Sequence, residues 1–305
     1  MLMISGDKNL VREGTSARER FLLQKSQVET LELVIWPQDF FKPLTIQGQF
    51  DVVTSQDPFW RGLIALVAAR RHRARLNVQL HANLRKQSWI KRLLAKIVLA
   101  RADSVRVVSN ALRDEVAHLT RAPVSVLPVY IDLSRFVDLQ REPRSQPQSV
   151  KTILWIGRFE DEKDPLLALE TLRAVRGAGI DAQLVMLGSG SLEEDLRKKM
   201  LSLGLTKNIE FPGWQDPLQH LKKADVVLCT SQAESFGASI VEALAAGVPV
   251  VAPDVGVARE AGAVISERTE LPQKTIEILQ ENTRGHLQIL LPTREKWAEL
   301  WKETL

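Results

Sequence analysis

Two glutamates, Glu234 and Glu242, stand on either side of a turn that leads from a strand into a helix. Glu234 precedes the turn at Phe236-Gly237, and Glu242 lies near the middle of the helix expected over Ser239–Ala246. Because about 7 residues make two helical turns, both carboxylates can approach one ligand. Ionised carboxylates repel phosphate but accept hydrogen bonds strongly, so they suit sugar and ribose hydroxyls. The alternative is a capping glutamate and a solvated helix glutamate.

The turn itself offers a second kind of contact. Gly237 lets the backbone come close to a ligand. The N–H groups at the start of the following helix have no partners within that helix, and the helix dipole favours negative charge there. The stretch Ser235-Phe236-Gly237 is therefore a candidate site for phosphate or sugar oxygens.

A charged loop follows the strand expected over Thr152–Gly157 and ends at Pro165, which suits the first turn of a helix. Arg158 and Lys163 lie in this loop, where two cations can grip a diphosphate. Such a grip would stabilise a leaving diphosphate electrostatically without a metal. A charged surface turn is the alternative.

Short apolar, β-branched runs alternate with helical patterns along the whole chain, which predicts parallel sheets covered by helices. We predict an α/β fold of two doubly wound, Rossmann-like domains facing across a cleft, with the ligand outside the carboxyl ends of the strands. The expected strands are Met1–Ser5, Leu31–Trp36, Asp51–Ser55, Leu76–His81, Ser104–Ser109 and Val124–Leu127, then Thr152–Gly157, Gln183–Gly188, Ile209–Pro212, Asp225–Thr230 and Pro249–Ala252.

The polar, Pro-containing stretch 141–149 has no periodicity and is expected to link the domains. We predict an N-terminal domain over residues 1–148, a C-terminal domain over 149–290, and a final helix over 291–305. Trp297 and Trp301 lie on one face of that helix, which is expected to pack back on the first domain. Residues 1–150 carry 23 Lys and Arg against 14 Asp and Glu, whereas the remainder carries 18 against 23.

The span 152–262 resembles the donor-binding domain of glycosyltransferase family 4, within the GT-B superfamily. The matching motifs are Gly157-Arg158 with Lys163, Leu187-Gly188-Ser189-Gly190, Phe211-Pro212-Gly213, Ala224-Asp225-Val226, Glu234 to Glu242 around Phe236-Gly237, and Gly247-Val248-Pro249-Val250-Val251. The first half resembles the family through Gln79-Leu80-His81-Ala82-Asn83, Val107-Val108-Ser109 and Leu127-Pro128. Its first loop has one glycine, Gly14, where the family usually has a pair.

The resemblance implies a role for each matching residue. Arg158 and Lys163 would bind the donor diphosphate, Glu242 the ribose, and Glu234 the transferred sugar, with Ser235, Phe236 and Gly237 nearby. The nucleobase would lie near Gly188 and the Phe211–Trp214 turn, which contains Pro212, and Gly157 would also belong to the donor site. His81 would face the transferred sugar, and Gly14 and Thr15 would touch the diphosphate. The resemblance further implies retention of anomeric configuration without a metal or cofactor. The usual proposal for the family is a front-face attack in which the leaving phosphate accepts the proton, so no protein nucleophile is required.

These features predict a retaining glycosyltransferase that moves a sugar from a nucleotide-diphosphate donor to a glycan or lipid-linked acceptor. The alternatives are a sugar-nucleotide epimerase or hydrolase on the same fold, and a non-catalytic sugar-nucleotide-binding module. A protein with one cysteine, Cys229, and no apolar run of about 18 residues is expected in the cytoplasm.

A basic amphipathic stretch, Trp89–Lys96, suits peripheral docking on an anionic membrane, and a solvated face is the alternative. Nucleic acid is not expected as a partner, because no nucleic-acid-binding motif accompanies the charge.

Overall fold

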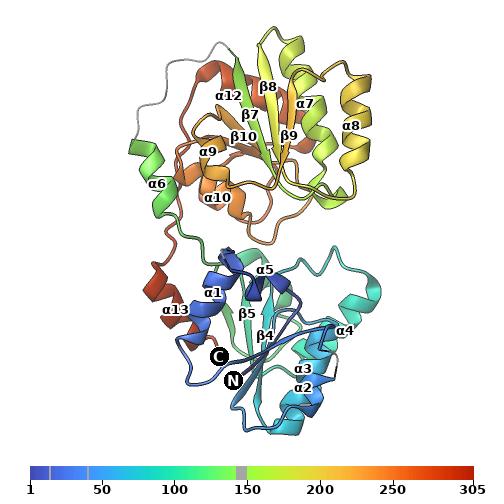
Figure 1. Cartoon of the computed structure of the whole chain (residues 1–305), viewed down its shortest axis with the longest axis vertical. Coiled ribbons are helices and arrows are strands. Elements are labelled where there is room, and N and C mark those ends of the chain that lie inside the picture. Colours follow the sequence, from blue (N-terminus) through green and yellow to red (C-terminus); the bar gives the residue numbers. More distant parts are fainter. Residues whose placement is uncertain (14, 40, 142–149) are drawn as a thin grey trace. The chain divides into compact units, whose positions relative to one another are not determined.

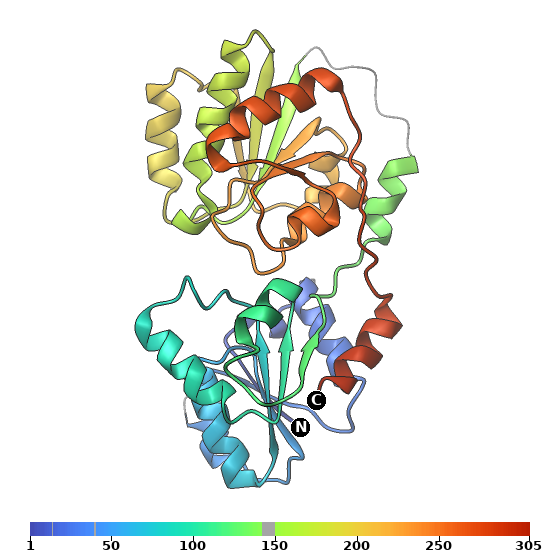
Figure 2. The same cartoon turned by 180° about the vertical axis from the view of Figure 1, so that it is seen from behind.

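The computed structural model describes residues 1–13, 15–39, 41–141 and 150–305 and divides into two compact units. The first unit comprises Met1–Ile131 and Leu291–Leu305, and the second comprises Asp132–Leu290. Each unit contains a six-stranded parallel sheet with helices packed against it (Figures 1 and 2). The predicted α/β class, with two doubly wound sheets, is confirmed.

The first sheet has the strand order β2-β1-β3-β4-β5-β6, so the direction of winding reverses between β1 and β3. Its strands are β1 Leu2–Ser5, β2 Glu32–Ile35, β3 Val52–Ser55, β4 Arg75–Leu80, β5 Ser104–Val107 and β6 Val124–Val126. The helical segments of this unit are η1 Lys8–Val11, α1 Ser16–Lys25, α2 Lys42–Thr45, α3 Trp60–His72, α4 Trp89–Leu99, α5 Asn110–Val116 and α13 Arg294–Glu303.

The C-terminal helix α13 is part of the first unit's core. Trp297 and Trp301 are fully buried in an apolar cluster with residues of β1 and α1. The indole Nε1 of Trp297 donates to the Pro128 carbonyl at 2.8 Å. The side chain of Asn77, on β4, donates to the Thr304 carbonyl at 2.8 Å. The last residues of the chain therefore complete a core that is built mainly from the first 131 residues.

The second sheet has the strand order β12-β11-β10-β7-β8-β9, with the reversal between β7 and β10. Its strands are β7 Lys151–Ile156, β8 Ala182–Leu187, β9 Ile209–Gly213, β10 Val226–Leu228, β11 Val250–Ala252 and β12 Val264–Ile265. The helical segments are α6 Ser134–Arg141, η2 Asp161–Lys163, α7 Pro165–Gly177, α8 Glu193–Ser202, α9 Pro217–Leu221, α10 Ala238–Ala245, α11 Ala258–Ala261, η3 Arg268–Glu270 and α12 Leu271–Glu281.

Beyond residue 262 the structure adds β12, η3 and α12, which the sequence patterns did not predict. Helix α12 packs on α7 and on β10 and β11. Helix α6 belongs to the second unit, where it lies against α10. The division between the units thus falls after Ile131, before the predicted linker, of which residues 142–149 lie outside the described ranges. None of the described helices is long and apolar enough to span a bilayer.

Candidate functional site

The winding reversal of the second sheet gathers most of the predicted site residues at one edge. Ligands of doubly wound sheets bind outside the carboxyl ends of the strands at such a reversal. Here β7 and β10 are hydrogen-bonded neighbours, and the loop after each strand carries a predicted cluster. The β7 loop contains Gly157, Arg158 and Lys163, and the β10 loop contains Glu234, Ser235, Phe236 and Gly237.

A chain of hydrogen bonds holds the two loops together. The indole of Trp155, on β7, donates to the Thr230 hydroxyl at 2.9 Å. That hydroxyl in turn donates to the carbonyl of Lys163 at 2.7 Å. The backbone N–H of Gln232 donates to the Glu162 carbonyl at 2.8 Å. Because these groups are backbone or buried, the loops form one connected structure with fixed relative positions.

Lys163 and Glu234 form an ion pair across these loops. The Lys163 ammonium lies 2.5 Å from Glu234 Oε1, which also accepts from the Ser231 hydroxyl at 2.7 Å. The two side chains are only 17% and 14% exposed, so the pair is more protected from solvent than a surface ion pair. The structure thus brings together the residue predicted to bind the diphosphate and the residue predicted to contact the sugar.

Arg158 lies apart from this pair. Its guanidinium forms an ion pair with Glu162, four residues further along the loop, and its side chain is 60% exposed. A diphosphate gripped by both cations would require Arg158 to leave Glu162. Lys163 is the less exposed of the two cations and pairs with the neighbouring loop, whereas Arg158 is a solvent-exposed charge that pairs within its own loop.

Glycines let the strand ends approach each other. A Cβ on Gly188 would lie 1.8 Å from the Gly157 carbonyl oxygen, and the φ angle of Gly188 is +153°. A Cβ on Gly190 would lie 2.4 Å from the Phe159 carbonyl oxygen. The backbone N–H of Gly188 donates to the carbonyl of Gly213, directly after Pro212, at 3.1 Å. The predicted positions Gly157, Gly188 and Pro212 therefore lie on adjoining strand ends.

Helix α10 begins at the predicted turn. Gly237 caps it with a φ of +93°, a conformation that favours glycine. Phe236 is buried, and its carbonyl accepts from the Val257 N–H at 2.9 Å. The first N–H groups of the helix lack partners within it. Together with the half-buried Ser235 they place hydrogen-bond donors at the helix start, on the loop that also carries Glu234.

Glu242 is half-buried in the middle of α10. Its charged neighbours are Asp216, which caps α9, and Arg135 of α6, and these two form an ion pair. Burial and the Asp216 carboxylate raise the pKa of Glu242 to about 7, although Arg135 acts in the opposite direction. The sequence patterns did not single out Asp216 or Arg135, since neither belongs to the motifs around Glu242.

The raised pKa of Glu242 predicts that donor binding strengthens as the pH rises through about 7. In the predicted ribose contact the hydroxyls donate to the ionised carboxylate, so binding at pH 6 should be up to about tenfold weaker than at pH 8. Calorimetric titration with a nucleotide sugar measures this, since its doubly esterified diphosphate does not titrate in that range. In Glu242→Gln the dependence should vanish; an unchanged pH profile would show that another group is responsible.

The same shift acts on stability in the opposite sense. Between the ordinary glutamate pKa of 4.5 and about 7, the folded protein holds a proton on Glu242 that the unfolded chain has lost. The contribution of this group to stability is therefore complete below pH 4.5 and is lost as the pH rises through 7.

The remaining predicted residues lie in the first unit. His81 directly follows β4 and lines a cavity of about 380 Å³. Burial, reinforced by Arg106 and Arg20, lowers its pKa to about 3, so the ring is neutral near pH 7. Thr15 caps α1, accepting from the Arg18 N–H at 3.2 Å and donating to the Asn9 carbonyl at 2.7 Å. Gly14 lies outside the described residues.

Sequence reasoning missed most of the cavity around His81. Arg20, Asp57, Arg61 and Arg106 line it, although no motif marks them. One signal was available: Arg106 is a charge inside the apolar strand Ser104–Val107, where a buried cation is unusual. Among the described residues, no group of three His, Cys, Asp or Glu side chains could hold a metal ion.

Two family models match the chain in succession. Residues 27–135 match the model described as Glycosyltransferase Family 4, and residues 137–266 match the model described as Glycosyl transferases group 1. The two matches cover most of both units. The chain belongs to glycosyltransferase family 4, within the GT-B superfamily.

Curated relatives match over part of their length. Phosphatidyl-myo-inositol mannosyltransferase of Mycobacterium leprae is 37% identical over 114 residues, which make up 36% of this chain and 30% of that protein. Glycogen synthase of Mycobacterium tuberculosis is 29% identical over 187 residues, 59% of this chain and 42% of that protein. The matches span less than half the length of these relatives.

A solved structure matches the whole chain. HepE of Anabaena, in complex with UDP and glucose, has a TM-score of 0.70, with coverage of 100% of this chain and 95% of that chain. The sequences are 16% identical, so this likeness shows the fold.

Proposed function

We propose that this chain is a glycosyltransferase that moves a sugar from a nucleotide-diphosphate donor to a glycan or lipid-linked acceptor. The observation that carries the proposal is the ion pair of Lys163 and Glu234 at the winding reversal of the second sheet. In this proposal Lys163 binds the diphosphate and Glu234 accepts hydrogen bonds from sugar hydroxyls, and the two joined loops support both roles. The names of two relatives support the proposal, since one is a glycogen synthase and the other a mannosyltransferase.

In the proposed reaction the bond between the anomeric carbon and the diphosphate oxygen breaks, and the acceptor oxygen forms the new bond on the same face. Lys163, with Arg158 drawn from Glu162, would stabilise the negative charge that develops on the departing diphosphate. The acceptor proton would pass to that leaving phosphate. The proposal requires no protein nucleophile, metal or cofactor.

A thermal-shift screen against UDP, GDP and ADP and their sugar conjugates, without added metal, tests the donor site. A ligand at 100 times its dissociation constant should add about 2.7 kcal/mol of stability. A shift with one diphosphate identifies the base and the donor to offer to acceptors. The absence of any shift from a folded sample would refute the donor site.

Transfer and hydrolysis then separate the candidate reactions. Incubation of the identified donor with and without acceptor glycans should release nucleotide only when an acceptor is present. Release of free sugar without transfer would instead indicate a hydrolase or epimerase. Donor binding without turnover would indicate a non-catalytic binding module.

We further propose that α4 docks the protein on an anionic membrane surface. The helix exposes the apolar side chains Trp89, Ile90 and Leu93, which are 68%, 43% and 51% accessible. Lys91, Arg92 and Lys96 lie on the same helix. Each cation near an anionic surface contributes about 1 kcal/mol, and the apolar side chains can enter the interface. A lipid-linked acceptor would be within reach of such a surface; the cytoplasmic location stays a prediction.

Flotation with vesicles tests this docking. The protein should float with vesicles that contain phosphatidylglycerol and stay behind with pure phosphatidylcholine. Trp89→Ser with Leu93→Ser should abolish flotation. Leu201→Ser is the matched control, because Leu201 is a 65% exposed apolar residue of α8 in the other unit. Equal flotation of all variants would contradict the assignment of α4.

A further inference from the structure

The cavity in the first unit lies at the winding reversal of its own sheet. Gly6 and Asp7 follow β1, and Gln56 and Asp57 follow β3, the two strands between which the order reverses. Doubly wound sheets bind ligands at this position. The space of about 380 Å³ is within the usual range for small-molecule pockets. None of the donor-site residues of the second unit lines it.

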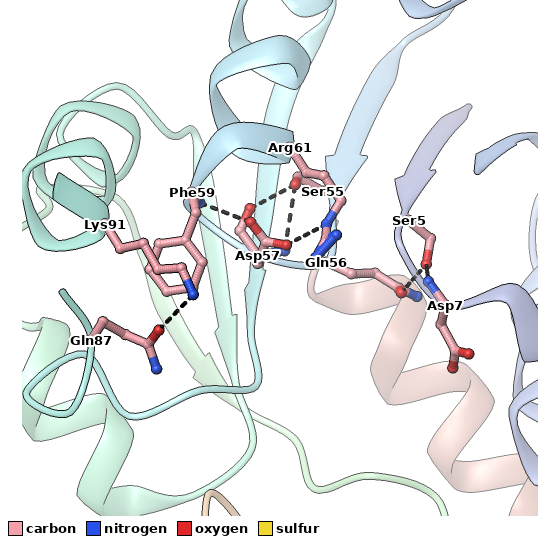
Figure 3. A network of polar contacts seen from close by, with 9 residues as sticks. All are labelled: Ser5, Asp7, Ser55, Gln56, Asp57, Phe59, Arg61, Gln87 and Lys91. Atoms are coloured by element: carbon pink, nitrogen blue, oxygen red, sulfur yellow. Dashed lines mark hydrogen bonds and ion pairs between the residues drawn. The ribbon is translucent and has the colours of Figure 1, made fainter. Parts of the chain in front are cut away.

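One wall of the cavity is held in place by hydrogen bonds (Figure 3). The Asp57 carboxylate accepts from the Phe59 N–H at 2.9 Å and from Arg61 Nε at 2.5 Å. The Gln56 side chain bonds the Ser5 hydroxyl. A Cβ on Gly6 would lie 2.1 Å from the Arg61 guanidinium, so glycine allows that group to lie against the backbone. Arg61 and Asp57 largely neutralise each other.

The lining of the cavity also contains a buried cation, Arg106, for which the described residues offer no carboxylate partner. Arg106 is 2% exposed. Its guanidinium donates to Gln79 Oε1 at 2.9 Å and to the carbonyls of Leu127 and Pro128, and it stacks 5.3 Å from the Trp297 ring centre. All of these acceptors are neutral. Burial and the nearby Arg20 lower the pKa of Arg106 to about 9, as expected for a cation that lacks a counter-charge.

Arg20, from α1, is the second cation. It is half-buried and lines the cavity, yet within the described part of the chain it makes no hydrogen bond or ion pair. The cavity's other carboxylate, Asp7, attracts it from a distance, but one oxygen of Asp7 already accepts from the Asn9 N–H at 2.9 Å. Burial lowers the pKa of Arg20 as well.

We propose that this cavity binds an acceptor through an anionic group, a phosphate or a carboxylate, with Arg20 as its direct partner and Arg106 as the buried charge behind it. The two positive charges of Arg20 and Arg106 exceed the single negative charge of Asp7, the one carboxylate of the lining that is not in an ion pair. His81 is neutral and adds no charge. A guanidinium matches the oxygens of both anions with two parallel hydrogen bonds. The inference rests on the proposed transfer reaction and adds the substrate class: an acidic acceptor rather than a neutral sugar.

Calorimetric titration of the full chain with matched probes tests the proposal. Glucose 6-phosphate and glucuronate are anionic forms of a sugar, glucose is the neutral control, and sn-glycerol 1-phosphate represents a phospholipid headgroup. At least one anionic probe should bind more than tenfold tighter than glucose, and its affinity should fall as the salt concentration rises. Preference for the glycerol phosphate indicates a lipid source, and preference for a sugar probe indicates a glycan.

Three variants connect binding with the cavity. Arg20→Gln should lower the affinity for the anionic probe by about tenfold to a hundredfold, as expected for the loss of a hydrogen bond between charged groups. Arg20→Lys should recover part of the loss. Arg113→Gln, which removes an exposed arginine on α5, should change nothing. No anionic preference, or equal loss in Arg20→Gln and Arg113→Gln, overturns the proposal.

Donor binding keeps this result separate from the proposed function. UDP, GDP and ADP should bind the Arg20 variants as they bind the unaltered chain. If the unaltered chain binds the donor but shows no preference for anionic probes, only the acidic acceptor is refuted. If the unaltered chain binds no donor, the proposed transfer reaction is refuted.

Discussion

Lys163→Ala is expected to abolish sugar transfer while the protein remains folded. Stabilisation of developing charge by one positioned group typically contributes about 100- to 1000-fold in rate, and Lys163 is the cation that the fold holds in the proposed donor site. Donor affinity should also fall by about 1.5–3 kcal/mol for the lost charged interaction. Steady-state kinetics and calorimetry measure the two effects. Lys207→Ala, an exposed lysine outside the site, is the control.

A companion variant separates the catalytic loss from a folding defect. Lys163→Ala leaves the Glu234 carboxylate, 14% exposed, without its partner, which should lower stability. Adding Glu234→Gln removes that unpaired charge and should restore the melting temperature without restoring transfer. Activity within tenfold of the unaltered chain in Lys163→Ala would refute the diphosphate assignment.

Gly188→Ala is expected to have the largest effect on stability. A Cβ at this position would lie 1.8 Å from the Gly157 carbonyl oxygen, which is backbone and cannot move aside as a side chain can. The φ of +153° adds backbone strain for any residue with a Cβ. The loss should exceed about 4 kcal/mol, since overlap and strain combine. Urea denaturation measures it, with failure to fold as the limiting outcome.

Gly177→Ala is the matched control. Gly177 ends helix α7, and a Cβ there would meet no heavy atom within 4 Å. Alanine is the better helix former, so this variant should be more stable by about 0.5–1 kcal/mol. Equal effects of the two substitutions would mean that the strand ends around Gly157 can separate easily.

Much of the fold was predictable from local pattern. The apolar runs at Leu2–Ser5 and Lys151–Ile156 appear as strands close to their predicted bounds, because parallel strands buried on both faces are nearly continuous in hydrophobicity. Helix α12 was missed, although its buried Leu271, Thr275 and Ile278 have helical spacing. The recognisable family motifs end near Gly262, so α12 lies outside the stretch that they mark.

The candidate site was predictable only in part. The glutamates, Lys163 and the glycine turns lie within motifs, so their types and spacing marked them. Arg20, Arg61 and Arg106 come from a helix, another helix and a strand, and no short pattern connects them. The raised pKa of Glu242 likewise depends on Asp216, which is distant in sequence from it.

The sequence by itself determined the alternation of strands and helices, the family and the donor-loop residues, because these are encoded in local spacing and contiguous motifs. The tertiary structure alone decided that Lys163 pairs with Glu234 and that α13 completes the first unit. It also decided that Arg20 and Arg106 share a cavity with too few carboxylates. Those facts depend on strand order and burial, which bring distant residues together and set the solvation of each charge.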